Sequence, residues 1–413
     1  MQQAELPAGA DEDPLSKRRA GPKNSRRGLR VALLYNAKEH APKVQGAPDD
    51  KFDELDPLDY VQAYAAALRS AGHTVFSADG GPSLAGKLAR RKVDICFNTC
   101  EGYRGDSREA QVPALLEMMG VPYTGARVMA LAITLDKAMT KRVLAYHGLP
   151  TPRFQEFERA DPPLDPGLRF PLFTKPNREG TAIGISYKSI VRDEAALRER
   201  VAYLLDAYHE TVLVEEYVDG RDVTCGLVGN LADPTLPTPP TGIPAADPLT
   251  PGGSADWNGL HLFPMSEVDH TSYEPGRAPI YSHRLKVDLA DDYHFFCPAV
   301  LPDAVARQLR RLTVETFRVT QCLDFCRVDF RLDVNDNLRP QILEINALPG
   351  ITPISDLTEC ARADGWSYEQ LINGVLDAAV RRQGLDGLLQ PALAKRGQAP
   401  AAAPALRSAA ASV

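Results

Sequence analysis

Long hydrophobic runs are missing from this sequence of 413 residues. No apolar segment approaches the roughly 20 residues that a membrane-spanning helix needs, and the first residues lack the apolar core of a secretory signal. We therefore expect a cytoplasmic protein with no membrane partner. The content of 44% hydrophobic and 24% charged residues is typical of two or three domains with buried cores.

The sequence contains few cysteines, and their number is odd. Seven cysteines are scattered along the chain, at positions 96, 100, 225, 297, 322, 326 and 360. This count and spacing fit neither a disulfide framework nor paired zinc knuckles. We expect reduced thiols with a structural role.

The common phosphate-binding fingerprints are also absent. The chain contains neither the G-x-x-x-x-G-K-[ST] loop nor the G-x-G-x-x-G turn. Its formal charge of -7 argues against nucleic acid as a partner, although residues 17–30 hold seven Lys or Arg and no acid. We interpret that basic run as part of a flexible leader.

Alternating strand and helix patterns predict an α/β protein. A buried strand at 30–35 precedes apolar residues at helical spacing, which end at Gly72. A second strand at 93–97 leads through a glycine-bearing loop to another helix, and a further helix is expected at 128–146. This order favours a parallel sheet. The region 170–230 follows as strand, glycine loop, strand, helix, strand and strand.

Two segments are poor in regular structure. Residues 231–251 include seven prolines, and no Lys or Arg occurs from 231 to 276, which predicts a surface insertion. The last residues hold ten alanines and three prolines and are expected to be disordered. The predicted organisation is a leader (1–29), an N-terminal α/β domain (30–126), a central domain (127–226), a C-terminal domain (227–390) with the insertion at 231–260, and a disordered tail (391–413).

Two strands near the C-terminal end, at 327–331 and 341–346, are joined by a short turn. A hairpin that turns on residues 336 and 337, both tolerant of positive φ, fixes how the strands pair. That pairing sets opposite each other Arg327 and Asn346, Asp329 and Glu344, and Arg331 and Ile342. Alternation of side chains then gives a polar face of Arg327, Asp329, Glu344 and Asn346 and an apolar face of Val328, Phe330, Leu343 and Ile345.

The polar face suits a hard cation. Facing Cβ atoms in a hairpin lie roughly 5 Å apart, and Asp329, Glu344 and Asn346 offer oxygen ligands of the kind that Mg²⁺ or Mn²⁺ prefers. We call these three residues the metal face. The alternative is a solvated sheet face with an incidental ion pair.

Lys175 ends a strand and precedes a loop over residues 177–184, which we call the glycine loop. Gly180 and Gly184 let its backbone N–H groups approach an anion, so a phosphate site is one interpretation. A simple hairpin turn fits equally well. The order of lysine, loop and strand becomes informative only in combination with other segments.

Two other charged pairs are ambiguous by themselves. The strand at 212–218 ends in Glu215 and Glu216 and offers backbone groups and a carboxylate to an adenine amino group, or it simply runs out into solvent. Lys137 and Lys141 lie one helical turn apart, which in most helices means solvated charge.

Taken in order, these segments resemble the ATP-grasp superfamily and, within it, the D-alanine-D-alanine ligase family. The resemblance runs from about residue 30 to 382 and rests on Asp136-Lys137, Lys175-Pro176 with the glycine loop, Glu215-Glu216 with Gly220-Arg221-Asp222, Lys286, Arg327-x-Asp329, and Glu344-x-Asn346 with Pro349-Gly350. It implies an ATP-grasp fold of α/β (α+β) class behind an N-terminal parallel α/β domain.

The resemblance also implies roles for individual residues. Phosphates of ATP would be contacted by Lys137, Lys175 and Lys286, adenine by Glu215, Glu216 and the Val218 backbone, and ribose by Asp222. Two Mg²⁺ ions, or Mn²⁺, would be held by the metal face. The catalytic set would be Arg327 and the Gly350 backbone N–H, which face a tetrahedral oxyanion, together with Thr181.

The implied reaction joins a small-molecule carboxylate to an amine and forms ADP. The carboxylate attacks the γ-phosphate to give an acyl phosphate, a step that metals and lysines promote by neutralising charge, and the amine then displaces phosphate. The expected substrates are amino acids or related molecules. One alternative is a genuine D-alanine-D-alanine ligase of peptidoglycan synthesis, and another is a catalytically idle ATP-binding regulatory protein. The oligomeric state stays open, with a homodimer as one alternative.

The substrate end departs from the family pattern. Thr181 and Ala182 stand where the family has two serines, and Val287 stands where a tyrosine follows the third lysine. Ser355 keeps the family's contact to the second substrate, but Asp356 replaces leucine. We therefore expect D-alanine to be a poor first substrate and a bulkier carboxylate to be preferred.

Overall fold

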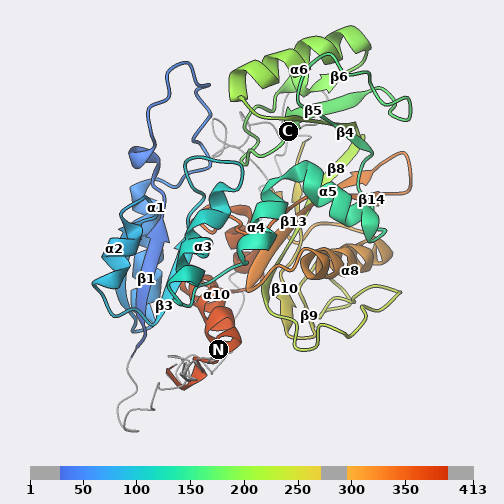
Figure 1. Cartoon of the computed structure of the whole chain (residues 1–413). Helices are drawn as coiled ribbons and strands as arrows, with labels where there is room; N and C mark the ends of the chain where they lie inside the picture. The colour runs from blue at the N-terminus through green and yellow to red at the C-terminus, as the bar shows by residue number, and fades with distance from the viewer. Residues whose placement is uncertain (1–27, 271–294, 389–413) are drawn as a thin grey trace, which may run out of the picture.

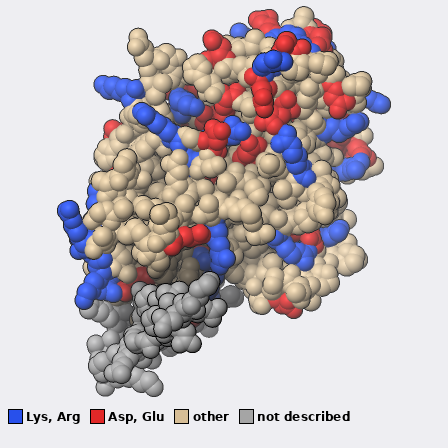
Figure 2. Space-filling view, in the orientation of Figure 1, with Lys and Arg blue, Asp and Glu red and all other residues tan. Residues whose placement is uncertain are grey.

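The computed structural model describes residues 28–270 and 295–388. Figure 1 shows an N-terminal unit beside a central unit, with a large sheet and its helices completing the molecule. On the face drawn in Figure 2, basic and acidic side chains are intermixed and gather mainly over its upper half. The predicted leader and tail lie almost entirely outside the described ranges.

The N-terminal unit is a parallel sheet in the order β2, β1, β3. Its elements are β1 (Arg30–Tyr35), α1 (Leu58–Ser70), β2 (Thr74–Asp79), α2 (Leu84–Ala89), β3 (Ile95–Thr99) and α3 (Gln111–Met118). The parallel pairing confirms the expected class, and β3 is the strand expected at 93–97. The sequence pattern missed β2, because only one of its residues is fully buried and no apolar run marks it.

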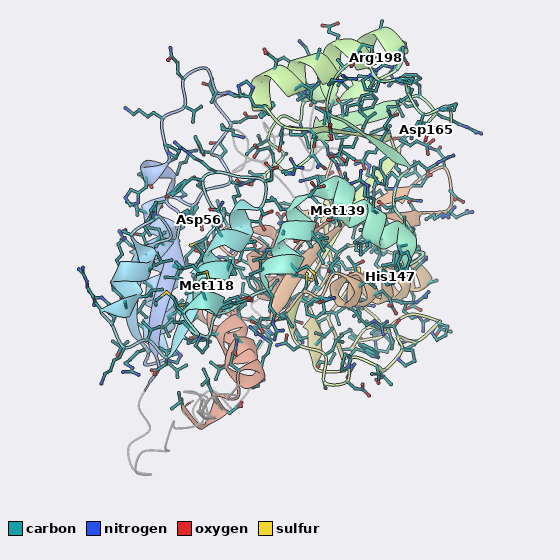
Figure 3. The ribbon with its side chains drawn as sticks, viewed as in Figure 1. Asp56, Met118, Met139, His147, Asp165 and Arg198 are labelled. Atoms are coloured by element: carbon teal, nitrogen blue, oxygen red, sulfur yellow. The ribbon has the colours of Figure 1, made fainter. Side chains whose placement is uncertain are left out.

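The single helix expected at 128–146 is two helices. α4 (Val128–Leu135) and α5 (Lys137–Tyr146) meet at Asp136, whose ψ of 100° is extended rather than helical. The Asp136 carboxylate accepts a hydrogen bond of 2.8 Å from the backbone N–H of Met139, which Figure 3 labels. This cap starts a new helix, and Lys137 is therefore its first residue.

The central unit is an antiparallel sheet in the order β4, β7, β5, β6, with a helix packed on it. Its elements are β4 (Phe154–Phe157), β5 (Leu172–Pro176), β6 (Ile190–Val191), α6 (Glu194–Tyr208) and β7 (Val212–Glu216). α6 buries Leu197, Val201 and Leu204 against the sheet. The predicted order of elements from 170 to 230 is confirmed, with β8 as the last strand.

The largest sheet has seven strands, all paired antiparallel, and β8 (Gly220–Gly229) is at its centre. One edge of β8 pairs with β13 (Phe325–Asp333), and the other pairs with β11 and then β10. The remaining elements are β9 (Ala255–Trp257), β10 (Leu260–Leu262), β11 (Ser266–Val268), β12 (Phe295–Phe296), α8 (Asp303–Val319), β14 (Arg339–Asn346), α9 (Asp356–Ala363) and α10 (Tyr368–Arg382), with short 3-10 turns at Lys38–His40, Arg108–Ala110, Tyr187–Ser189 and Asp386–Leu388. Within the described ranges, no helix has the length and apolarity needed to cross a membrane.

The proline-rich segment is a surface feature only in part. Most of residues 231–250 are exposed, but Ile243 is buried, and the segment is tied to α8. The tie is Arg310, a fully buried cation that donates hydrogen bonds to the backbone carbonyls of Ile243, Pro251 and Gly253. β9 lies within the range expected for the insertion and β10 begins at its last residue, and both strands extend the large sheet.

All seven cysteines have free thiols. Six are buried, and Cys297 is partly buried. Burial raises the pKa of the Cys96 and Cys322 thiols to about 12, which keeps them protonated at neutral pH. Their burial is in line with the structural role expected for them.

Candidate functional site

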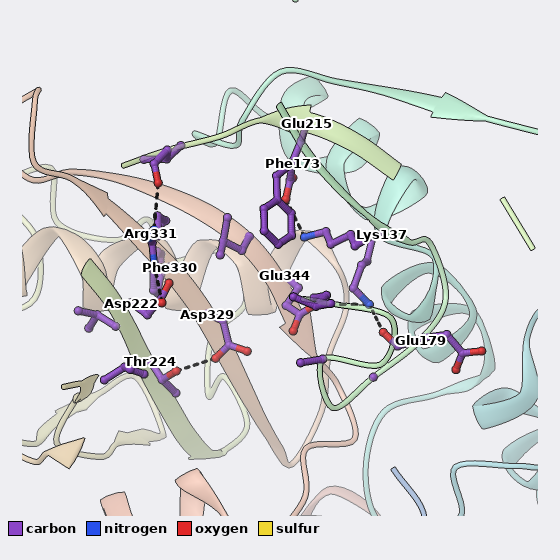
Figure 4. A pocket seen from close by; sticks show the side chains of 18 of the residues that line it. Lys137, Phe173, Glu179, Glu215, Asp222, Thr224, Asp329, Phe330, Arg331 and Glu344 are labelled. Carbon is purple, nitrogen blue, oxygen red and sulfur yellow. Dashed lines mark hydrogen bonds and ion pairs between the residues drawn. The ribbon is translucent and has the colours of Figure 1, made fainter. Parts of the chain in front are cut away.

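A cleft opens between the central sheet and the large sheet, and Figure 4 shows it from close by. It encloses about 1040 Å³, its open mouth included. Ten of the residues predicted for the site line this cleft: Lys137, Lys175, Ala182, Glu215, Glu216, Val218, Asp222, Arg327, Asp329 and Glu344.

The other predicted residues lie beside the cleft or outside the described ranges. Asn346 donates a hydrogen bond of 3.0 Å to Asp329, and Thr181 belongs to the glycine loop. Gly350 lies next to Ser355. A Cβ atom placed on Gly350 would be 3.9 Å from the Cβ of Ser355. Two predicted residues fall in the undescribed range 271–294: Lys286 and Val287.

The hairpin of β13 and β14 carries the metal face. Its register sets Arg327 opposite Asn346 and Asp329 opposite Glu344, which confirms both predicted pairs. Arg331 lies opposite Gln341 instead of the predicted Ile342, because a β-bulge shifts the register after Asp329.

The bulge also changes which side chains of β14 face the core, relative to the prediction. Leu343 was expected on the apolar face, but it lines the cleft, and Ile342 is buried in its place. The turn differs as well: the strands are joined by five residues, 334–338, with positive φ at Asn337 and Leu338, instead of a two-residue turn. The longer loop and the bulge offset each other, so the pairs at the metal face come out as predicted.

The chemistry of the metal face fits a divalent cation bound partly by its substrate. Asp329 accepts hydrogen bonds from Thr224 at 2.7 Å and from Arg327 at 2.9 and 3.0 Å, and Glu344 lies 3.3 Å from the Lys137 ammonium. No cluster of three or more His, Cys, Asp or Glu suited to a metal occurs in the described part of the chain. Two carboxylates and a carboxamide match Mg²⁺, which usually keeps water and phosphate among its ligands.

Two lysines of α5 are buried, Lys137 in the lining of the cleft and Lys141 against Glu215. Helical spacing alone suggested solvated charge for this pair, whereas the family resemblance assigned Lys137 to phosphate; in the structure Lys141 is fully buried and Lys137 is only 8% exposed. Lys141 lies on the same helix face as Ala138 and Leu144, which are also buried. Reasoning from the sequence missed Lys141 as a site residue, although this helical periodicity could have revealed it.

Glu215 lies between two lysines. Its carboxylate oxygens are 2.7 Å from Lys141 and 2.7 Å from Lys175. Burial alone would raise the pKa of the Glu215 carboxyl, but the two ammonium groups hold it below its ordinary value. Burial lowers the pKa of Lys141 to about 8 against the opposing effect of Glu215. This buried charge cluster fixes Lys175 at the wall of the cleft.

One end of the cleft is aromatic. The rings of Phe173 and Tyr217 stack with centroids 6.5 Å apart. Arg331, which the sequence did not single out for the site, donates hydrogen bonds to the Val218 carbonyl at 3.0 Å and to Asp222 at 2.5 Å. Burial would raise the pKa of the Asp222 carboxyl, but Arg331 and His270 hold it below its ordinary value.

The glycine loop closes the cleft on the side of the N-terminal unit. Lys137 donates a hydrogen bond of 2.6 Å to the Glu179 carbonyl. Thr181 and Ala182 both have positive φ, of 47° and 56°, a conformation that non-glycine residues rarely adopt. Such strained residues persist only where surrounding contacts hold them.

Residues 50–54 make the contacts that stabilise the glycine loop in this conformation. The Asp50 carboxylate accepts a hydrogen bond of 2.9 Å from the backbone N–H of Gly184, and Glu54 accepts one from Gly180. Arg108 pairs with Glu54 at 2.6 Å and with Glu179 at 3.4 Å. No pattern in the sequence marks this segment, because its partners on the glycine loop are more than 100 positions away.

The opposite end of the cleft, which we call the distal end, is lined by Arg327 and Asp356, with Ser355 next to Asp356 in the chain and Gly350 next to Ser355. Arg327 and Arg331 are four residues apart on β13, which separates the two ends by about 13 Å. Arg327 pairs with Asp329 at 2.9 Å and with Asp356 at 3.2 Å. Burial would lower the pKa of Arg327, but the two carboxylates raise it, so the guanidinium stays charged.

Comparisons with known proteins agree on one family. The model of the D-ala D-ala ligase C-terminus matches residues 143–239 and 264–377. An uncharacterized protein of Sinorhizobium fredii is 34% identical over 332 residues, which cover 78% of this chain and 88% of that protein. A D-alanine-D-alanine ligase of Cupriavidus metallidurans is 34% identical over 317 residues, or 76% of this chain and 84% of the relative.

A solved structure supports the fold independently. The crystal structure of the D-alanine-D-alanine ligase from Bacillus anthracis complexed with ATP superposes with a TM-score of 0.61. The match covers 87% of this chain and all of the other chain, at 19% identity. At that identity the likeness establishes the fold alone.

Proposed function

This chain belongs to the D-alanine-D-alanine ligase family, and we propose that its cleft binds ATP and two divalent cations to join a small-molecule carboxylate to an amine. Membership makes it an ATP-dependent ligase that forms a C–N bond. The observation that carries the proposal is the meeting of two lysines, the glycine loop and the metal face around one cleft.

The aromatic end is proposed to hold the nucleoside. Phe173 and Tyr217 offer flat apolar surface to a base, and the backbone at Glu216 and Val218 offers hydrogen-bonding groups at the end of β7. Asp222 lies one strand away, held by Arg331 and His270, and is proposed to contact the ribose. Because Lys141 and Lys175 both pair with its carboxylate, Glu215 is proposed to act on ATP mainly by positioning Lys175.

The phosphates are proposed to lie between Lys137, Lys175 and the glycine loop, with Lys286 as a further contact. Lys137 and Lys175 line the cleft and are both buried. Solvent therefore screens their charges only weakly. Asp329, Glu344 and Asn346 would hold Mg²⁺ or Mn²⁺, which when bound would neutralise phosphate charge and orient the transferred group.

The distal end is proposed to hold the reacting carboxyl group. Arg327 keeps its charge at any working pH, and together with the Gly350 backbone N–H it would stabilise a tetrahedral oxyanion. Thr181 and Ser355 are proposed to position the substrates, and no protein nucleophile is required. The residues thus supply orientation and charge compensation rather than covalent chemistry.

The first substrate is proposed to be bulkier than D-alanine. Ala182 lines the cleft with a methyl group and offers no hydroxyl to a small polar substrate. Val287 is proposed to contribute a second apolar contact. The alternative, synthesis of D-alanyl-D-alanine itself, is favoured by the relative of Cupriavidus metallidurans, which is named a D-alanine-D-alanine ligase.

Phosphate release tests this proposal. Purified protein would be incubated with ATP, Mg²⁺ and pairs drawn from an amino-acid panel that includes D-alanine, and products would be identified by mass. We expect release that depends on both substrates and is abolished in Asp329→Asn. A protein that binds ATP but releases no phosphate with any pair would contradict a ligase. A dominant D-alanyl-D-alanine product would restore the alternative.

A further inference from the structure

We propose that Asp356 makes the distal end select an amine without a free carboxylate beside it, such as an amino-acid amide. The inference rests on the proposed ligase function and narrows the class of its second substrate. Three observations at the distal end carry it: the pairing of Arg327, the start of α9, and the hydroxyl of Ser355.

Arg327 is already matched by two carboxylates. Its Nε and Nη2 groups donate to Asp329, and its Nη1 group lies 3.2 Å from Asp356. All three side chains are at most 18% exposed. Asp329 belongs to the metal face, whereas Asp356 adds a further negative charge here and takes up the Nη1 group of Arg327. A substrate carboxylate placed here would meet repulsion in a setting that screens charges weakly.

The start of α9 offers little compensation. A helix N-terminus attracts anions through its unpaired N–H groups and its dipole, and the N-cap Ser355 makes no side-chain cap on α9. However, Asp356 is the first residue of this helix, and Glu359 also lies in the first turn. Glu359 is paired with Arg362, so it is the Asp356 carboxylate that opposes the positive potential that would otherwise draw in a carboxylate.

The Ser355 hydroxyl is engaged within its own turn. It lies 3.1 Å from the Thr352 carbonyl, to which it donates, and 3.1 Å from the Thr358 hydroxyl. Thr358 donates to the same carbonyl at 2.7 Å. The serine proton therefore has an acceptor inside the protein, and Ser355 is left to position a substrate by accepting a hydrogen bond, which suits an amine or amide N–H rather than a carboxylate.

Asp356 lies close to where the amine is expected to approach. If Arg327 and Gly350 face the oxyanion of the attacked carbonyl, the incoming amine approaches beside them, and Ser355 adjoins Gly350. The group attached to the amine's own α-carbon is then close to the start of α9. A neutral amide there avoids the repulsion that a carboxylate meets.

The test compares free amino acids with their amides as acceptors, and the change in their ratio between wild type and variant cancels the intrinsic difference in reactivity of the two amines. Hydroxylamine, a small neutral amine, would first be used with ATP and Mg²⁺ to find carboxylates that the enzyme activates, detected as hydroxamates. With such a carboxylate, kcat/KM would be measured for D-alanine against D-alaninamide and for glycine against glycinamide. We expect the wild type to prefer each amide. Asp356→Asn should shift the acid-to-amide ratio toward the acid on the order of tenfold or more, because a nearby like charge is removed.

Two controls separate selection from a merely structural role. Asp356→Glu keeps the charge and should keep the preference for amides. Glu359→Gln removes an exposed charge from the same helical turn and should leave the ratio unchanged. If Asp356 only positioned Arg327, its substitution would slow both acceptors equally, and the ratio would not move.

The outcomes distinguish the inference from the function beneath it. A wild type that prefers free acids, or an unchanged ratio in Asp356→Asn, overturns the role of Asp356 while hydroxamate formation still stands. Absence of hydroxamate with every carboxylate contradicts the ligase itself. If Asp356→Asn does not fold, Asp356→Ser takes its place, and a wild-type preference for free acids still refutes the inference.

Discussion

Glu54 and Gly180, which are 126 positions apart, are joined by a hydrogen bond of 3.3 Å from the glycine N–H to the carboxylate. Asp50 makes the same kind of contact to Gly184. Carboxylates of the N-terminal unit therefore bind the glycine loop through the same backbone N–H groups that are proposed to approach a phosphate. If the loop binds phosphate as proposed, the nucleotide would compete with Glu54 and Asp50 for these N–H groups.

Glu54→Ala should loosen the glycine loop. Without the carboxylate, Gly180 loses its acceptor and Arg108 keeps only Glu179 as an anionic partner, so we expect faster hydrogen exchange over residues 177–184. Hydrogen-deuterium exchange read by mass spectrometry would measure it. Asp161→Ala, which removes an acid that is 73% exposed, is the control and should leave the loop unchanged. Equal exchange in wild type and Glu54→Ala would show that this contact does not hold the loop.

Glu344→Gln should cut phosphoryl transfer by orders of magnitude while the fold stays nearly intact. The change removes one carboxylate from the metal face and weakens the pair with Lys137, and catalysis that depends on metal positioning is sensitive to both. Phosphate release and a thermal melt would be measured together. Asp336→Asn, in the exposed loop of the same hairpin, is the matched control. Near-normal turnover in Glu344→Gln would remove this residue from the site.

Lys141 should give the stability a defined dependence on pH. Its pKa is lowered by burial to about 8 from an ordinary value of 10.5, so between these values the unfolded chain binds more protons than the folded one. Wild-type stability should therefore rise relative to Lys141→Met as the pH increases from about 8 to 10.5. Urea denaturation at several pH values would measure the difference. The exposed Lys188→Met serves as control, and a difference that is flat or falls with pH would refute the assignment.

Arg310→Leu should destabilise the protein by about 2 kcal/mol or more, because several buried carbonyls lose their donor at once. The side chain is fully buried and ties residues 243–253 to α8. Arg307→Leu on the same helix is a suitable control, since its pair with Asp303 is exposed and worth roughly 1 kcal/mol at most. Equal stability of the two variants would mean that the proline-rich segment contributes little to the fold.

The metal face could be predicted because its signal is local. Period-two alternation assigns each strand residue to a face, and the mismatch of Asp329 and Glu344 with their apolar neighbours marks a polar face regardless of the rest of the fold. The break of the predicted helix at Asp136 has a local cause as well, since aspartate is a favoured N-cap. It was missed because the apolar pattern continues from α4 into α5.

The rest of the site depends on contacts between distant segments. Lys141 pairs with Glu215, and Glu54 meets Gly180, only after the units are packed together. Periodicity could have assigned Lys141 to a buried face, but no pattern within the chain identifies its partner. The proline-rich segment was underestimated for the same reason, because Arg310 lies well beyond it in sequence.

The β-bulge after Asp329 also bears on how this hairpin can vary through evolution. β13 is held along its whole length by β8, from Gly220 to Val228, and the bulge absorbs the offset between the loop and the metal face. Residues 334–338 can therefore gain or lose a residue without turning Asp329 and Glu344 to the opposite face. The same loop is a natural point for inserting an epitope or a fluorescent reporter without disturbing the cleft.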